Sequence, residues 1–120
     1  GKRKDPYNGR WAMHEGIDLA ATAGSPVLAT APGLVKFAGQ KSGYGRIVIL
    51  DHGFGMTTHY GHLRSISVEK GARVANRATI GALGSSGRST GPHVHYEIRV
   101  DGSPLDPQNF LKAGKHVFKE

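Results

Sequence analysis

Arg46-Ile47-Val48-Ile49-Leu50-Asp51 is the stretch that decides the fold, because four consecutive apolar residues between charged ends are typical of a strand buried on both faces. The next residues, His52-Gly53-Phe54-Gly55, contain two glycines that allow a tight turn. They are followed by Met56-Thr57-Thr58-His59-Tyr60, whose β-branched and aromatic side chains favour a strand. We therefore predict an antiparallel hairpin over residues 46–60 at the centre of the fold. His62 then falls at or just past the end of the second strand.

Glycine punctuates the sequence on both sides of this hairpin. The chain has 18 glycines among 120 residues, about twice the usual share of about 7%, and they separate short apolar runs. Residues 25–30 and 34–39 predict a second hairpin around Ala31-Pro32-Gly33. Gly71 and Asn76-Arg77 predict corners between very short strands. The expected fold class is all-β, a compact antiparallel β-sheet core with short hairpins and long loops.

The most regular strand pattern begins at His93. Alternation over residues 93–100 divides the side chains between two faces of a strand: His93, His95, Glu97 and Arg99 lie on one face, and Val94, Tyr96, Ile98 and Val100 on the other. Residues 85–92 predict a Gly/Ser-rich loop before this strand, and Asp101-Gly102 a tight turn after it. Asp106 as N-cap and Pro107 as first helical residue predict one short helix over residues 106–111, the only helix that we expect.

Length and composition indicate one domain over residues 1–120 without covalent staples. The absence of cysteine excludes disulfides, thiolate metal sites and cysteine nucleophiles, so any metal must be held by nitrogen and oxygen. The sequence has no apolar run of membrane-spanning length, and it begins without an initiator Met or an apolar signal core. We expect a domain excised from a longer or processed precursor, and a monomer.

The chain is basic, with 16 Lys and Arg against 9 Asp and Glu and a formal net charge of +7. Such an excess attracts polyanions in general, and acidic wall polymers are among them. The basic residues are spread along the chain and are not interleaved with aromatic residues in a base-stacking pattern. We therefore predict a solvated basic surface and no nucleic-acid partner.

Five residues far apart in the sequence carry the chemistry: His14, Asp18, His62, His93 and His95. Imidazoles and a carboxylate are the ligands of a catalytic zinc, which takes three from protein and leaves the fourth position for water. Each segment also has a simpler interpretation. His93 and His95 alone equally fit two solvent-exposed side chains, and the segment of His14 and Asp18 alone fits an Asx-type turn beside an unrelated histidine.

Taken together, these segments resemble the lysostaphin/LytM-type zinc endopeptidases, which cut peptide cross-bridges of bacterial cell walls. The resemblance is carried by His14-Glu15-Gly16-Ile17-Asp18, Tyr60-Gly61-His62-Leu63 and His93-Val94-His95-Tyr96-Glu97, and it extends from about His14 to Leu111. It implies a lysostaphin-like fold of the duplicated-hybrid-motif type. It also implies that His14, Asp18 and His95 bind Zn²⁺, that His62 and His93 are catalytic, and that the protein acts on peptidoglycan peptides in the cell envelope, periplasmic or secreted.

The chemistry of this ligand set follows from its charge. Two neutral imidazoles and one carboxylate leave a zinc ion with net positive charge, so water bound to it ionises near neutral pH. The sequence has no H-E-x-x-H motif, so proton transfer falls to His62 and His93.

The remaining polar candidates are given lesser roles. We predict that Glu97 lies behind the metal ligands or at the surface. His59 is predicted to be a packed or exposed side chain, with a role as metal ligand as the alternative. His52 and His116 are predicted to be structural or exposed.

Two other classes of protein stay open at this point. A metal-free regulatory or cell-wall-binding module of the same fold is the first alternative, and the complete five-residue set argues against it. A lipoyl or biotinyl carrier is the second, suggested by the glycine-punctuated pattern over residues 68–81. Neither Met13 nor Met56 adjoins a lysine, as the carrier motif requires.

Overall fold

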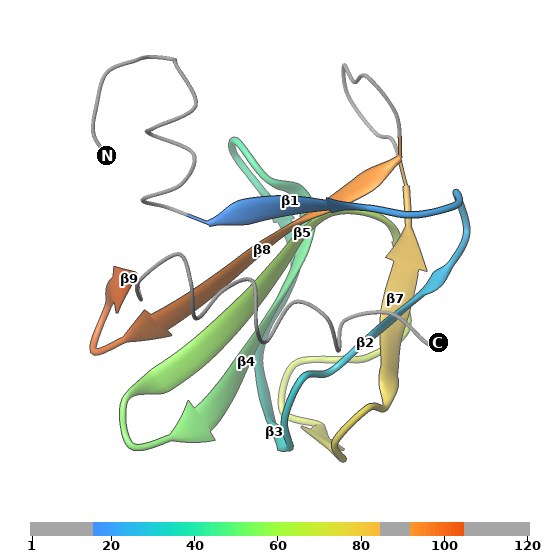
Figure 1. The fold of residues 1–120 in the computed structure, drawn as a ribbon. Coiled ribbons are helices and arrows are strands. Elements are labelled where there is room, and N and C mark those ends of the chain that lie inside the picture. Colours follow the sequence, from blue (N-terminus) through green and yellow to red (C-terminus); the bar gives the residue numbers. More distant parts are fainter. Residues whose placement is uncertain (1–15, 85–91, 105–120) are drawn as a thin grey trace, which may run out of the picture.

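The computed structural model describes residues 16–84 and 92–104. These residues form nine strands in one sheet and no helix, which confirms the all-β fold class (Figure 1). The strands are β1 (Ile17–Ala20), β2 (Pro26–Leu28), β3 (Gly33–Lys41), β4 (Gly45–Gly53), β5 (Met56–Ile66), β6 (Arg73–Val74), β7 (Thr79–Leu83), β8 (His93–Val100) and β9 (Ser103–Pro104). Among the described residues there is no apolar helix of membrane-spanning length. His14, His116, the loop over residues 85–91 and the helix expected over residues 106–111 lie outside the described residues.

The sheet is antiparallel and its main path runs β1-β8-β5-β4-β3-β6. The predicted central hairpin is confirmed: β4 and β5 pair across the turn at Phe54 and Gly55, and residues 47–50 are all buried. The second strand is longer than predicted, because β5 continues to Ile66. The placement of His62 at or past a strand end is therefore wrong, and His62 lies within β5.

The predicted hairpin around Ala31-Pro32-Gly33 is also wrong. β2 does not pair with β3; it pairs with β7, where Val27 lies opposite Gly81. This distant pairing buries Val27 and Ala29 completely in one hydrophobic cluster with Ile80, whereas a local hairpin would place β2 beside β3. The predicted corner at Asn76-Arg77 connects the short strands β6 and β7, and the predicted turn at Asp101-Gly102 connects β8 with β9. Gly71 lies before β6 as expected, but the strand that precedes it is β5, with 11 residues, and not a very short one.

The core lies against one face of the sheet. It consists of aliphatic side chains around two tyrosines, Tyr60 and Tyr96, whose rings are 5.5 Å apart. In β8, the core face carries Val94, Tyr96 and Ile98, as the alternation predicts. The other face of β8 therefore carries His93, His95, Glu97 and Arg99 on a rigid central strand.

Candidate active site

The antiparallel pairing of β1 with β8 brings Asp18 directly opposite His95, although 77 residues separate them in the sequence. The Oδ1 atom of Asp18 lies 2.9 Å from the Nδ1 atom of His95. The Asp18 side chain is 56% exposed and that of His95 17% exposed. A carboxylate and an imidazole thus meet at a point that solvent reaches.

Gly16 allows this close approach of β1. Its φ is +146°, and a β-carbon there would lie 2.6 Å from the Cγ atom of Glu97 and 2.7 Å from the carbonyl oxygen of Tyr96. Any side chain at this position would push β1 away from β8. The glycine of His14-Glu15-Gly16-Ile17-Asp18 is therefore needed for the pairing that positions Asp18.

The donor atoms fit a zinc ion. Bond lengths of about 2.0–2.1 Å place two ligands of a tetrahedral zinc roughly 3.3 Å apart, which needs only a small separation of Asp18 Oδ1 and His95 Nδ1 from their 2.9 Å. The other ring nitrogen of His95, Nε2, is already engaged, 2.8 Å from Glu97 Oε2. Within residues 16–84 and 92–104 no group of three His, Cys, Asp or Glu side chains is arranged to hold a metal ion, and His14 lies outside these residues.

Glu97 is completely buried behind His95, on the side away from Asp18. Its two oxygens accept three hydrogen bonds: from His95 Nε2, from the Tyr44 hydroxyl at 3.0 Å, and from the Nε atom of Arg99 at 2.7 Å. The Nη2 atom of Arg99 also forms an ion pair with Oε1 of Glu97 at 2.7 Å. Burial acts to raise the pKa of Glu97, but the hydrogen bonds from His95 and Arg99 outweigh it and hold the pKa below its ordinary value. Glu97 is thus an ionised carboxylate that fixes the orientation of the His95 ring.

The two carboxylates create a site that favours positive charge. Burial lowers the pKa of His95, yet hydrogen bonds to Asp18 and Glu97 raise it overall to about 9. The hydrogen bond with His95 is also the main reason why the pKa of Asp18 is lowered. A position between Asp18 and His95 that stabilises a proton so strongly also stabilises a metal cation in its place.

His62 and His93 complete the group of imidazoles. Their ring centroids are 5.2 Å apart, and the His62 ring is 6.2 Å from that of His95. His62 has a φ of +63°, an uncommon conformation for a residue other than glycine, and its N–H donates to the Tyr44 carbonyl at 2.7 Å. This strained position within β5 turns the ring toward His93, and such strain is typical of functional sites.

Of the sequence-predicted site residues, the structure brings together Asp18, His62, His93 and His95. His59 and His52 lie elsewhere. The His59 Nε2 atom contacts the Thr57 hydroxyl at 3.1 Å, and His52 contacts the Pro32 carbonyl and the Thr58 hydroxyl.

The sequence also matches a known family of peptidases. The sequence model of a family described as "Peptidase family M23" matches residues 12–107. The chain belongs to peptidase family M23. The match covers the three segments that hold the candidate site and most of the described strands.

Relatives of the chain have names that refer to peptidases, and in one case to peptidoglycan. The chain is 47% identical over 107 residues to "DD-carboxypeptidase/endopeptidase Mpg" of Neisseria meningitidis, covering 89% of this chain and 25% of that protein. It is 39% identical over 112 residues to "Peptidoglycan DD-endopeptidase ShyA" of Vibrio cholerae, covering 93% of this chain and 25% of that protein. The chain thus spans about a quarter of the length of these relatives.

Solved structures of M23 peptidases have the same fold. Lysostaphin from Staphylococcus simulans matches with a TM-score of 0.76 at 34% identity, over 87% of this chain and 46% of that chain. A zinc-containing peptidase from Vibrio cholerae matches with a TM-score of 0.76 at 37% identity, over 88% of this chain and 33% of that chain. The expected family, the lysostaphin-like fold and the enzyme class of metallopeptidase are therefore confirmed.

Two residues of this M23 site were not singled out from the sequence. Tyr44 reaches Glu97 from the turn between β3 and β4, and its ring is 5.8 Å from that of His95. Arg99 neutralises Glu97 from the same strand. The alternation over residues 93–100 already places Arg99 on the face of His95 and Glu97 but assigns it no role, and no local pattern indicates a contact between Glu97 and a tyrosine 53 residues away.

Proposed function

We propose that this domain is a zinc-dependent endopeptidase that hydrolyses peptide cross-links of bacterial peptidoglycan, in the cell envelope or outside the cell. Membership of peptidase family M23 supports the reaction class, and the names of the relatives support a peptidoglycan substrate with DD-peptide bonds. The observation that carries the proposal is the meeting of Asp18 and His95 at 2.9 Å beside the paired rings of His62 and His93.

The residues divide into a metal-holding set and a proton-transferring set. His14, Asp18 and His95 would hold the zinc, with Glu97 fixing the tautomer of His95 so that Nδ1 faces the ion. Zinc bound there supplies a Lewis acid that polarises the scissile carbonyl and makes water nucleophilic near neutral pH.

His62 and His93 perform the proton transfers of the hydrolysis. One imidazole takes the proton from the attacking water, and a protonated imidazole gives one to the nitrogen of the departing amine. Two rings with centroids 5.2 Å apart can serve both sides of one scissile bond. The backbone of β8 holds His93, and the hydrogen bond from the His62 N–H to the Tyr44 carbonyl holds His62. Both rings are thus positioned before substrate binds.

Metal content and digestion of cell walls test this proposal. The purified chain is expected to contain about one zinc ion, and it should release muropeptides from purified peptidoglycan, detected by mass spectrometry. A chelator should abolish release and added zinc should restore it, whereas Asp18→Ala should lose both zinc and activity. Walls with different cross-bridges identify the bond that is cut. Binding to walls without release of any muropeptide by the zinc-loaded chain would instead support a wall-binding module.

A further inference from the structure

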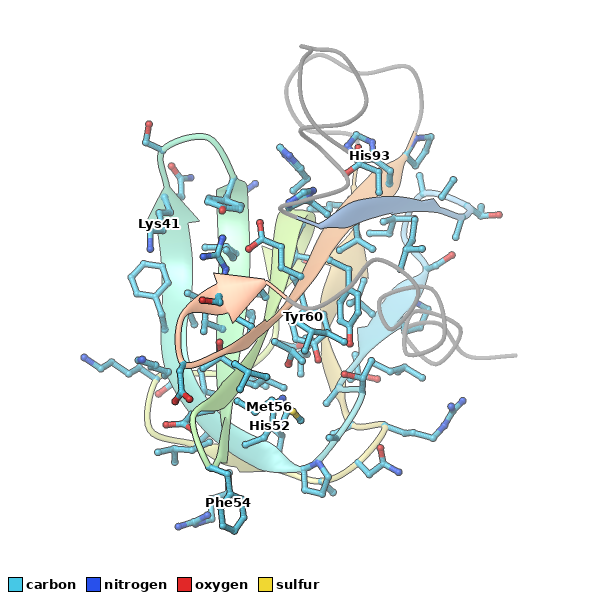
Figure 2. The ribbon with its side chains drawn as sticks, turned by 60° about the vertical axis from the view of Figure 1, so that its left-hand side comes forward. Lys41, His52, Phe54, Met56, Tyr60 and His93 are labelled. Carbon is cyan, nitrogen blue, oxygen red and sulfur yellow. The ribbon has the colours of Figure 1, made fainter. Side chains whose placement is uncertain are left out.

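A groove of about 680 Å³ lies beyond the active site on the same face of the sheet. Arg99 lines this groove and also contacts Glu97, which in turn contacts His95, so a chain of direct contacts leads from the site into the groove. Figure 2 shows the extent of the molecule along this direction, with His93 at one end and Phe54 at the other. The groove lining contains none of Asp18, His62, His93 and His95, and Arg99 connects the groove to the buried Glu97 behind His95.

The floor of the groove contains a row of side chains from three strands, and the row ends beside the buried Glu97 of β8. Phe37 in β3 pairs with Ile49 in β4, Ile49 pairs with His59 in β5, and His59 pairs with Glu97 in β8. Three steps between strands span roughly 14 Å, which corresponds to about four residues of extended peptide. The row is apolar at Phe37 and Ile49 and polar toward the active site.

Positive charge lies along the apolar end of this row. Lys36 and Lys41 are exposed on β3 and line the groove, and the Lys41 Nζ atom is 5.9 Å from the centre of the Phe37 ring. Among the described residues neither lysine has a carboxylate within ion-pair distance. The carboxylate of Asp51, which also lines the groove, accepts the backbone N–H of Gly53 at 2.9 Å.

The positive charges along the groove also affect the pKa of His59. Burial is the main cause that lowers the pKa of His59 to about 4, and the charges of Arg99, Lys41 and Lys36 act in the same direction, against Glu97. His59 is thus neutral at ordinary pH and adds no charge of its own to the floor. An anion entering the groove would meet the ammonium groups of Lys36 and Lys41. The two carboxylates that also line the groove, those of Asp51 and Asp101, lie beyond ion-pair distance of both lysines.

We propose that this groove binds a peptide segment of the substrate that bears a free carboxylate, on one side of the bond that is cut. This inference rests on the proposed function and names the class of substrate that the site prefers. Phe37 and Ile49 would contact the aliphatic part of the segment, and Lys36 and Lys41 its carboxylate. A neutral bridge made only of glycine would use neither feature.

A pair of substrates that differ only in charge tests the proposal. The same cross-linked peptide is prepared with its side-chain and terminal carboxylates free or amidated, and kcat/KM of the zinc-loaded chain is measured on both. The double variant Lys36→Gln/Lys41→Gln should lose about tenfold in kcat/KM on the carboxylate form, mainly through KM, and keep its rate on the amidated form. Lys36→Arg/Lys41→Arg should restore the preference, because it restores the charge.

The matched control is Lys70→Gln/Arg77→Gln, which removes the same charge from two exposed positions outside the groove and should leave the preference intact. An equal loss on both substrates, or no loss in the Lys36→Gln/Lys41→Gln variant, would overturn the groove assignment and leave the proposed function standing. Failure of the wild type to cleave either substrate would overturn the proposed function and the groove assignment with it.

Discussion

Tyr96 and Glu97 are consecutive residues of β8 and both side chains are fully buried, but they lie on opposite faces of the sheet. On the core face, the Tyr96 hydroxyl contacts the Thr30 hydroxyl at 3.0 Å, which also contacts the hydroxyl of Tyr60 at 3.0 Å. On the site face, Glu97 binds the charged side chain of Arg99 and the imidazole of His95. One strand thus carries a neutral network on one side and an ionised one on the other.

The neutral network is complete in itself. It continues from Tyr60 to the Thr58 hydroxyl at 2.8 Å and to the Nε2 atom of His52 at 2.6 Å. Because the Pro32 carbonyl can only accept, Nδ1 of His52 donates to it at 2.7 Å, while Nε2 contacts the Thr58 hydroxyl. Burial raises the pKa of Tyr60 and Tyr96, so both phenols remain protonated. This face contributes stability, whereas the site face uses its charges to position His95.

The largest expected effect on the site face is on turnover. His62→Ala or His93→Ala should lower kcat by about 10²-fold or more, because each removes an imidazole that transfers protons. Zinc content should stay near that of the wild type, measured by elemental analysis, since neither residue belongs to the proposed ligand set. Near-normal turnover in both variants would contradict the assignment of His62 and His93 as the residues that transfer protons.

A smaller effect is expected from Glu97→Gln. The amide preserves the size of the side chain but removes the charge that balances Arg99 and orients His95, so zinc affinity should fall about 10- to 100-fold. Competition with a chromogenic chelator measures this affinity. Unchanged zinc affinity together with a lower melting temperature would mean that Glu97 serves only stability, as its neighbour Tyr96 does.

Tyr96→Phe is the matched change on the core face. It removes one buried hydroxyl and its hydrogen bond to Thr30, so the free energy of unfolding should fall by about 1 kcal/mol, measured by urea denaturation. Zinc affinity and kcat/KM should not change, although the residue lies between His95 and Glu97 in the sequence. A loss of zinc affinity comparable to that of Glu97→Gln would show that the two faces are coupled.

The two faces of β8 could be predicted from the sequence because alternation with a period of two residues is a local property. The burial of Val94, Tyr96 and Ile98 confirms it. The same holds for the β4 to β5 hairpin, where the apolar run and the glycine-containing turn are adjacent. The pairing of β2 with β7 was missed because its partners are more than 50 residues apart and no local pattern encodes such a choice.

The grouping of the candidate site residues also depends on strand pairing that local sequence patterns do not predict. Asp18 lies opposite His95 only through the register of β1 with β8, and sequence spacing does not reveal that register. The resemblance to a known family provided the grouping, and the roles of His14, Asp18, His62, His93 and His95 remain predictions. The position of His62 within β5 depends on a positive φ, which the residue type does not indicate.

The smallest expected effect concerns a residue in a turn between two strands. Phe54 lies at the tip of the hairpin between β4 and β5, is 103% exposed, and has a φ of +55°, followed by Gly55 with a φ of +77°. Two successive positive φ values are what a type I′ turn requires, and Asn-Gly is its preferred sequence. Phe54→Asn should therefore raise the free energy of unfolding by about 0.5 to 1 kcal/mol in urea denaturation, by reducing backbone strain. Phe54→Ala is the control, because it removes the aromatic ring but keeps the unfavourable conformation, and it should bring no comparable gain. Equal gains in both variants would assign the effect to the exposed ring instead of the backbone.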